Sequence, residues 1–325
     1  MKKREYRPYE ENAKEIQDKL LEARIEAVNL VCQKAPKREW KKYTERMIHI
    51  FFLLLGLITV GCVLLITVYL VISGIPAISK IGLVDFLFGE EWASTASEPK
   101  YGILPFILTS IYGTAGAIAI GVPVGFMTAV YLSKLASPKI KSVMQSAVSL
   151  LAGIPSVVYG LVGMLVLIPG IRILFGVPDG ASLLAAIIVL AIMILPSIIK
   201  MSITALDAVP KEYEDASLAL GATPIETYFK VSVPAAKSGI AASVVLGVGR
   251  AIGEAMAVMM VAGNVPNMPD SLFQSVRFLT TAVSSEMSYS SGLQRQALFS
   301  IALVLFLFIM LINATLNFFL KREKE

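Results

Sequence analysis

Six runs of mostly apolar residues, each close to the length needed to cross a membrane, dominate the sequence. They cover about 47–73, 105–132, 146–169, 182–200, 239–263 and 296–320. A transmembrane helix needs about 20 consecutive apolar residues to cross the hydrocarbon layer. Only 16% of the residues are charged and 56% are hydrophobic, which excludes a disordered chain and most soluble enzymes. The runs predict an all-α, polytopic membrane protein with six transmembrane helices.

The basic residues predict how these helices are oriented. With six spans, 23 of the 29 Lys and Arg residues fall on the side that holds both termini. Positively charged loops stay in the cytoplasm, so both termini are expected there and the chain in a cell membrane. We expect a cytoplasmic tail over 1–46 with an amphipathic helix at about 12–31, a transmembrane domain over 47–320 and a short tail over 321–325. The helix at 12–31 either lies on a surface or packs against a partner, or it is merely solvated.

The reactive side chains are too few and too scattered for a catalytic or metal site. Cys62 lies in an apolar run and Cys32 in a charged stretch, so we expect neither a disulfide nor a catalytic thiol. His49 is the single histidine, and no Cys, Asp or Glu cluster accompanies it. The Ser residues of the spans have no nearby base. We therefore expect no enzyme activity, no catalytic residue and no metal in this chain.

The loop over 201–238 is unusually structured for a connection between spans. Pro210 suits the first turn of a helix that runs to Leu220, and Gly221 suits its C-terminal end. Thr223-Pro224-Ile225-Glu226 is a capping box that begins a second helix. Pro234 is expected to end the loop before the next span. Two short helices around a glycine turn form a rigid surface suited to receiving another protein.

Arg250 and Glu254 are the charges expected inside a span. A charge at the centre of a bilayer costs about 2.5–3.5 kcal/mol on insertion scales, so it needs a reason to be there. Four residues apart, the two side chains are expected on one helix face, where they either form a structural ion pair or mark a polar station on a substrate path. Gly247, Gly249 and Gly253 would let a helix or a ligand approach. A guanidinium matches tetrahedral oxyanions.

The third run contains a second irregular stretch, Gly153-Ile154-Pro155-Ser156, followed by Tyr159. Its Gly and Pro residues are expected to interrupt the helix and expose backbone groups. Ser156 and Tyr159 are then candidate hydrogen-bond donors to a substrate, unless the Pro only kinks the helix and the Tyr packs inside. The stretch PGIRILFGVPDGAS at 169–182 is expected to be a turn.

The 201–238 loop resembles the cytoplasmic signature of ABC importer permeases, which reads Glu-Ala-Ala, three residues, Gly, nine residues, then Ile-x-Leu-Pro. The matching residues are Asp215, Ala216, Ser217, Gly221 and Pro234. The resemblance implies the type I permease fold and a coupling helix that docks on an ATP-hydrolysing subunit. The chain contains no Walker-type phosphate-binding motif. We therefore expect no cofactor in this chain, with ATP-Mg bound by the partner.

A narrower resemblance covers about 47–320. Gly249-Arg250-Ala251-Ile252-Gly253-Glu254, its continuation to Gly263-Asn264, and the 153–160 stretch are similar to the PstC-like permeases of phosphate-specific ABC importers. The resemblance implies transport of inorganic phosphate. It also implies a complex with a PstA-like permease, two ATPase subunits and an extracytoplasmic phosphate-binding protein.

Two other functions compete with this interpretation. One is an ABC permease for another oxyanion, molybdate or sulfate, which the coupling loop fits equally well. The other is a stand-alone secondary transporter or channel. The sequence shows no clear inverted repeat, and a single charge pair is little for ion coupling.

Overall fold

The structure is a computed structural model that describes residues 16–17, 19–28 and 38–322. The chain divides into two units, residues 1–67 and 68–325. In the first unit, 16–17 and 19–28 are helical, and α2 (Arg38–Ile81) begins. The remainder of the helix expected at about 12–31 lies outside the described residues. The side chains of 43–66 are exposed, as expected of an apolar helix without its membrane or partners.

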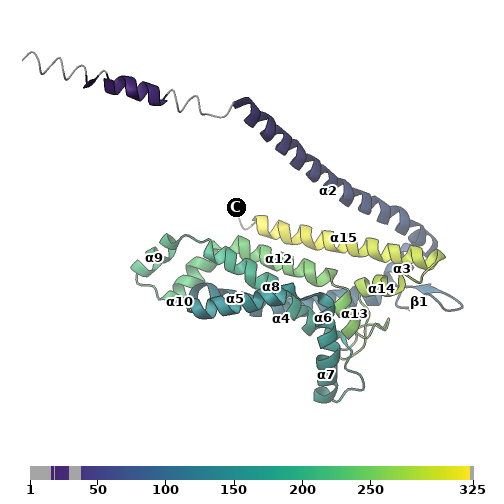
Figure 1. The fold of residues 1–325 in the computed structure, drawn as a ribbon. Helices are drawn as coiled ribbons and strands as arrows, with labels where there is room; N and C mark the ends of the chain where they lie inside the picture. Colours follow the sequence, from purple (N-terminus) through teal and green to yellow (C-terminus); the bar gives the residue numbers. More distant parts are fainter. Residues whose placement is uncertain (1–15, 18, 29–37, 323–325) are drawn as a thin grey trace, which may run out of the picture. The chain divides into compact units, whose positions relative to one another are not determined.

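The second unit is almost entirely helical (Figure 1). After α2 come α3 (Leu83–Phe88), the hairpin β1 (Trp92–Ala93) and β2 (Lys100–Tyr101), α4 (Leu104–Val130), η1 (Tyr131–Leu135) and α5 (Pro138–Gly153). Next are α6 (Ser156–Val162), η2 (Gly163–Leu167), α7 (Ile168–Phe175), α8 (Leu183–Asp207), α9 (Lys211–Ala219) and α10 (Pro224–Thr227). The last are η3 (Tyr228–Ser232), α11 (Val233–Ala235), α12 (Lys237–Gly253), α13 (Met256–Val261), α14 (Leu279–Glu286) and α15 (Gly292–Arg322).

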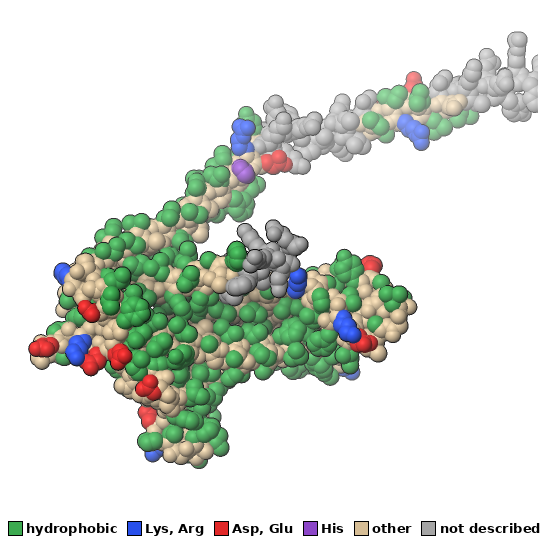
Figure 2. Space-filling view, turned by 180° about the vertical axis from the view of Figure 1, so that it is seen from behind, with side chains coloured by type: hydrophobic (Ala, Val, Ile, Leu, Met, Phe, Trp, Pro, Cys, Tyr) green, Lys and Arg blue, Asp and Glu red, His purple; other side chains and the backbone are tan. Residues whose placement is uncertain are grey.

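The membrane-length helices confirm the all-α, polytopic architecture. Among the described residues, five helices are long and apolar enough to cross a membrane, and a pair bent by 71° near Ala236 makes six if it counts as one span. The five are Tyr43–Ile81, Leu104–Leu135, Ser156–Phe175, Leu183–Asp207 and Gly292–Thr315. In Figure 2 a broad hydrophobic surface of the second unit separates charged side chains at its two ends. We call these ends the α9 side and the β1 side.

Helix α8 is the centre of the second unit and packs between α4 and α12. Glycines of α4 let α8 come close, since a Cβ on Gly121 would lie 2.6 Å from Ile194 Cδ1 and one on Gly125 2.9 Å from Ile198 Cγ2. Gly247 of α12 also faces Ile198. Small residues facing branched ones are the usual way for membrane helices to pack without a hydrophobic driving force.

The third apolar run, at 146–169, is interrupted where its Gly and Pro residues predict a break. Helix α5 ends at Gly153, Ile154 and Pro155 are extended, and a new helix starts at Ser156. Proline disfavours a helical residue before it, which ends α5 there. The turn expected at 169–182 begins later than predicted, because α7 continues to Phe175 with Pro169 in its first turn. Gly176, with φ +64°, then ends the helix.

Candidate functional site

The α9 side presents the two short helices that the sequence predicts. Helix α9 starts after Pro210, and Gly221 adopts φ +89° in the turn that follows. Thr223 Oγ1 accepts the Glu226 N–H, and the Glu226 carboxylate accepts the Thr223 N–H, so the capping box is confirmed. The hydrogen bonds from Thr223, and then Lys230, lower the pKa of the Glu226 carboxyl.

The residues of the coupling signature lie around this turn. Asp215, Ala216 and Gly221 are exposed, so a partner can reach them. Ser217 is half-buried, and its hydroxyl bonds the buried Thr227 hydroxyl at 2.9 Å, which joins α9 to α10. Pro234 is exposed but does not end the loop as predicted. It lies in the first turn of α11, and the chain bends at Ala236 instead. A proline in a first helical turn loses no hydrogen bond.

A second layer of contacts holds α9 against the helices behind it. Lys134 Nζ donates to Glu214 Oε1 at 2.6 Å, and Ser232 Oγ donates to the same oxygen at 2.8 Å. The Lys134 and Glu214 side chains are only 11% and 17% exposed. The sequence analysis missed this anchor. Its one local signal is Glu214 beside the signature residue Asp215, while Lys134 lies 80 positions away.

The first helix break lies between α5 and α6. There the chain changes direction, and α6, η2 and α7 run across the line of α5 (Figure 1). The Tyr159 hydroxyl donates to the Leu151 carbonyl at 2.7 Å and so satisfies a group that the break releases. Ser156 is half-buried in the first turn of α6. The predicted interruption of the helix is confirmed.

The second break, between α12 and α13, contradicts the prediction that Arg250 and Glu254 share one helix face. Gly253 ends α12 and Glu254 is extended, with φ −74° and ψ 128°, so no continuous helix puts the two side chains on one face. Arg250 Nη1 donates to Ser197 Oγ of α8 at 3.2 Å. Among the described residues, the ion pairs include none between Arg250 and Glu254.

Glu254 instead caps the N-terminal end of α13. Its Oε1 accepts the Ala257 N–H at 3.0 Å, and a carboxylate at a helix N-terminus is stabilised by the helix dipole. Its backbone carbonyl accepts the Thr280 hydroxyl at 2.8 Å. Of the three glycines expected to admit a neighbour, Gly247 contacts Ile198, whereas Gly249 and Gly253 face open space.

The two breaks are neighbours, because α6 and α13 pack against each other. A Cβ on Gly160 would lie 3.0 Å from Ala257 Cα, and one on Gly163 would lie 2.7 Å from Val261 Cγ1. Each helix begins directly after its break. Broken helices inside an apolar bundle release backbone and side-chain polar groups, and such breaks are tolerated where they are buried in protein or line a cavity.

A polar cluster on the β1 side was also missed. Glu286 accepts hydrogen bonds from Trp92 Nε1, Ser94 Oγ, Gln294 Nε2 and Arg277, with which it forms an ion pair. Arg277 also donates to the Asn264 carbonyl at 2.8 Å. Its partners come from residues up to about 200 positions apart, and no local pattern brings them together.

Comparison with known proteins identifies the family. Residues 121–324 match the family described as binding-protein-dependent transport system inner membrane component. The chain belongs to this family. It is therefore an inner-membrane component of a transport system.

Curated relatives and solved structures agree with this assignment. The chain is 40% identical to "Probable ABC transporter permease protein YqgH" of Bacillus subtilis (strain 168), covering 79% of this chain and 86% of that protein. It is 34% identical to "Phosphate transport system permease protein PstC" of Haemophilus influenzae, covering 82% and 87%.

The fold resembles a permease chain of a bacterial alginate ABC transporter, with a TM-score of 0.57 and 16% identity over 87% of this chain and 96% of that one. It also resembles a chain of the MetNI methionine ABC transporter, with a TM-score of 0.51 and 21% identity over 68% and 94%. At these identities the two structures support the type I permease fold alone.

Proposed function

We propose that the chain is the PstC-like permease of an ATP-driven importer of inorganic phosphate and forms half of the translocation path. The observation that carries the proposal is Arg250. Its described partner is the neutral Ser197 hydroxyl, so no carboxylate neutralises its charge among the described residues. An unneutralised guanidinium beside a helix break suits a tetrahedral oxyanion, which it binds through two parallel hydrogen bonds. The similarity to a relative named as a phosphate permease supports this anion.

The other candidate residues take distinct roles in this proposal. Glu254 caps α13 and so holds the second break open beside Arg250. Ser156 and Tyr159 offer hydroxyl groups at the first break, where Tyr159 is already bonded to the Leu151 carbonyl. Because α6 and α13 are in contact, both breaks contribute to one polar region. Phosphate is expected to pass through this region when the paired permeases alternate between outward and inward openings.

The α9–α10 surface is the proposed ATPase contact. Asp215, Ala216 and Ser217 lie in α9, Gly221 in the turn that follows and Pro234 in α11. The largely buried Glu214–Lys134 pair ties α9 to η1. A push on α9 is therefore expected to reach η1, which directly continues α4. The partners are a PstA-like permease, two ATPase subunits that bind ATP-Mg, and an extracytoplasmic phosphate-binding protein.

The charge distribution orients the proposed complex. Both termini and the 201–238 loop are placed in the cytoplasm by the excess of basic residues on that side. In this arrangement residues 1–46 form a cytoplasmic tail, 47–320 the transmembrane domain and 321–325 a short C-terminal tail. The β1 side then faces the binding protein.

Reconstitution of the complex in vesicles tests the proposal. We expect ATP-dependent uptake of labelled phosphate, and phosphate-stimulated ATPase activity with the loaded binding protein. Arg250→Ala and Glu254→Ala are expected to abolish uptake while the complex still assembles, and Ser197→Ala is expected to retain most of it. Uptake of sulfate or molybdate in place of phosphate would reject the proposed substrate. Wild-type uptake in both variants, or loss of assembly in both, would remove the two residues from the path.

A further inference from the structure

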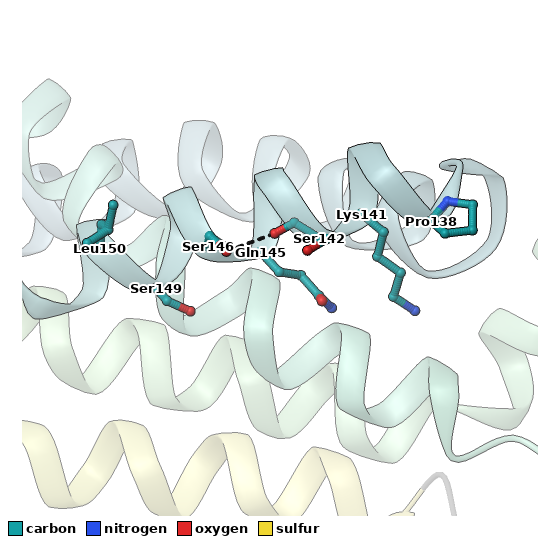
Figure 3. Close-up of a pocket in the computed structure, with 7 residues that line it drawn as sticks. All are labelled: Pro138, Lys141, Ser142, Gln145, Ser146, Ser149 and Leu150. Atoms are coloured by element: carbon teal, nitrogen blue, oxygen red, sulfur yellow. Dashed lines mark hydrogen bonds between the residues drawn. The ribbon is translucent and has the colours of Figure 1, made fainter.

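A groove of about 700 Å³ runs along one side of α5. It is lined by Pro138, Lys141, Ser142, Gln145, Ser146, Ser149 and Leu150 (Figure 3). Figure 3 shows the Lys141, Gln145 and Ser149 side chains extending from the same side of the helix. The polar residues repeat at three- and four-residue steps, so they form one continuous face about 10 Å long between Ser142 and Ser149. None of them belongs to the site described above.

The hydrogen-bond donors of this face are largely unused. Among the described residues, the Ser142, Gln145 and Ser149 side chains have no hydrogen-bond partner, while Ser146 Oγ donates to the Ser142 carbonyl. On the same side of α5 as Gln145, and three residues further along, Val148 is buried in a cluster with Ile199 and Ile203 of α8, so the groove runs beside the contact between α5 and α8. A polar face of this length in contact with lipid would leave its amide and hydroxyl groups unsatisfied. It needs a polar neighbour or water.

The charges around the groove favour an anion. No carboxylate lines it. Its one charged lining residue is Lys141. The Lys141 ammonium pairs with Asp207 at 3.0 Å, and the Lys141 side chain is 29% exposed. The lining therefore offers hydroxyl and amide donors without a full opposing charge. Such donors bind an oxyanion weakly enough to release it, which conduction requires.

The groove also connects two places already described. Its Lys141 end is near the α9 side, because Lys141 bonds Asp207 at the end of α8, just before α9. Its other end, at Ser149 and Leu150, lies one turn before Gly153, where the first helix break begins. The face therefore leads from the break toward the side of the coupling loop.

We propose that the α5 groove is the cytoplasmic half of the phosphate path, and that Ser142, Gln145, Ser146 and Ser149 hand the hydrated anion from the helix breaks to the cytoplasm. The inference rests on the proposed function and deepens it. Arg250 at the break selects the anion, and the uncharged donors of α5 let it leave.

Charged thiol reagents test this proposal in the complete reconstituted complex. In a background with Cys32→Ser and Cys62→Ser, single Ser146→Cys and Ser149→Cys variants are treated with an anionic or a cationic methanethiosulfonate of similar size. The matched control is Ala147→Cys, which is exposed on α5 but nearly opposite Ser149. We expect the anionic reagent to lower phosphate uptake at least tenfold at both groove positions. The cationic reagent should lower it less than threefold, and the control should respond to neither.

Comparing inhibition by the anionic and by the cationic reagent distinguishes an anion path from a surface that packs against another helix. Equal inhibition by both reagents would mean that α5 packs against a partner helix there, and absence of labelling would mean that protein or lipid covers the groove. Either result overturns the proposal while phosphate uptake by the untreated complex leaves the proposed function standing. If the untreated complex transports another oxyanion, the phosphate assignment fails. The effects of the anionic and cationic reagents on uptake of that anion then test whether the groove is part of its path.

Discussion

Replacing Glu214 with glutamine should loosen the coupling loop without changing its surface. The variant keeps the size of the side chain and an oxygen for the Ser232 hydroxyl, but it leaves the Lys134 ammonium without its opposite charge. Both side chains of the pair are largely buried, at 11% and 17% exposure. The perturbation therefore acts on the attachment of α9, whereas the exposed signature residues stay intact.

The expected loss follows from the geometry of the Glu214–Lys134 pair. Two unit charges 2.6 Å apart attract by about 6 kcal/mol at an effective dielectric constant of about 20. Partial desolvation of the two ions offsets part of this attraction. Removing one partner of a buried pair typically costs about 3–5 kcal/mol, and the remaining exposure of this pair lowers our expectation to about 2–3 kcal/mol.

Hydrogen exchange of the α9 amides in the assembled complex measures this loss. A fall of about 2–3 kcal/mol in the local opening free energy corresponds to exchange that is roughly 30- to 140-fold faster. The control is Lys230→Met, which breaks the Glu226–Lys230 pair of the same loop. Because that pair is 49% and 74% exposed and screened by solvent, its loss should speed exchange by no more than about twofold.

A double variant gives the decisive comparison. Lys134→Met combined with Glu214→Gln removes the uncompensated charge and should recover at least half of the lost protection. Uptake per ATP hydrolysed should fall in Glu214→Gln and rise again in the double variant. Exchange in Glu214→Gln that is no faster than in Lys230→Met would refute the view that this pair anchors α9.

Three further substitutions test other parts of the structure. Gly160→Leu should lower the thermal unfolding temperature in detergent, because its Cβ would lie 2.8 Å from Met260 Sδ and overpacking costs about 1–3 kcal/mol. The control is Gly170→Leu, since a Cβ on Gly170 would have nothing within 4 Å. Equal stability of both variants would contradict the contact between α6 and α13. Glu286→Gln, in a Trp40→Phe background, should shift the Trp92 emission to longer wavelength as the Arg277 ion pair opens, and unchanged emission would count against the cluster. Gly221→Val should reduce co-purification of the ATPase, since the backbone angle φ of +89° costs a branched residue about 1–2 kcal/mol. Gly221→Asn should retain more of the ATPase. Full retention of the ATPase by the Val variant would argue against the coupling-loop interpretation.

The features that could be predicted from the sequence depend on neighbouring residues. Membrane-length helices follow from apolar runs, because a span is a local property of length and composition. The two helices around Gly221 and the capping box at Thr223 follow from side chains that bond backbone groups three residues away. The break before Ser156 follows from Pro155.

The positions of Arg250 and Glu254 could not be predicted from neighbouring residues. Arg250 and Glu254 are four residues apart, and no proline marks an end to the helix between them. The spacing therefore predicted a shared face. In the structure Gly253 ends α12, and Glu254 gains both the N–H of Ala257 and the hydroxyl of Thr280, a partner 26 positions away.

Sequence alone thus determined the fold class, the two short helices of the 201–238 loop, and the charge that has to be explained inside an apolar run. Only the tertiary structure decided which groups that charge meets. Ser197 reaches Arg250 from α8, Lys134 reaches Glu214 from η1, and α6 meets α13 across the two breaks. The physical reason is that helix formation and membrane insertion depend on nearby residues, whereas a buried polar group takes the partner that packing brings within about 3 Å.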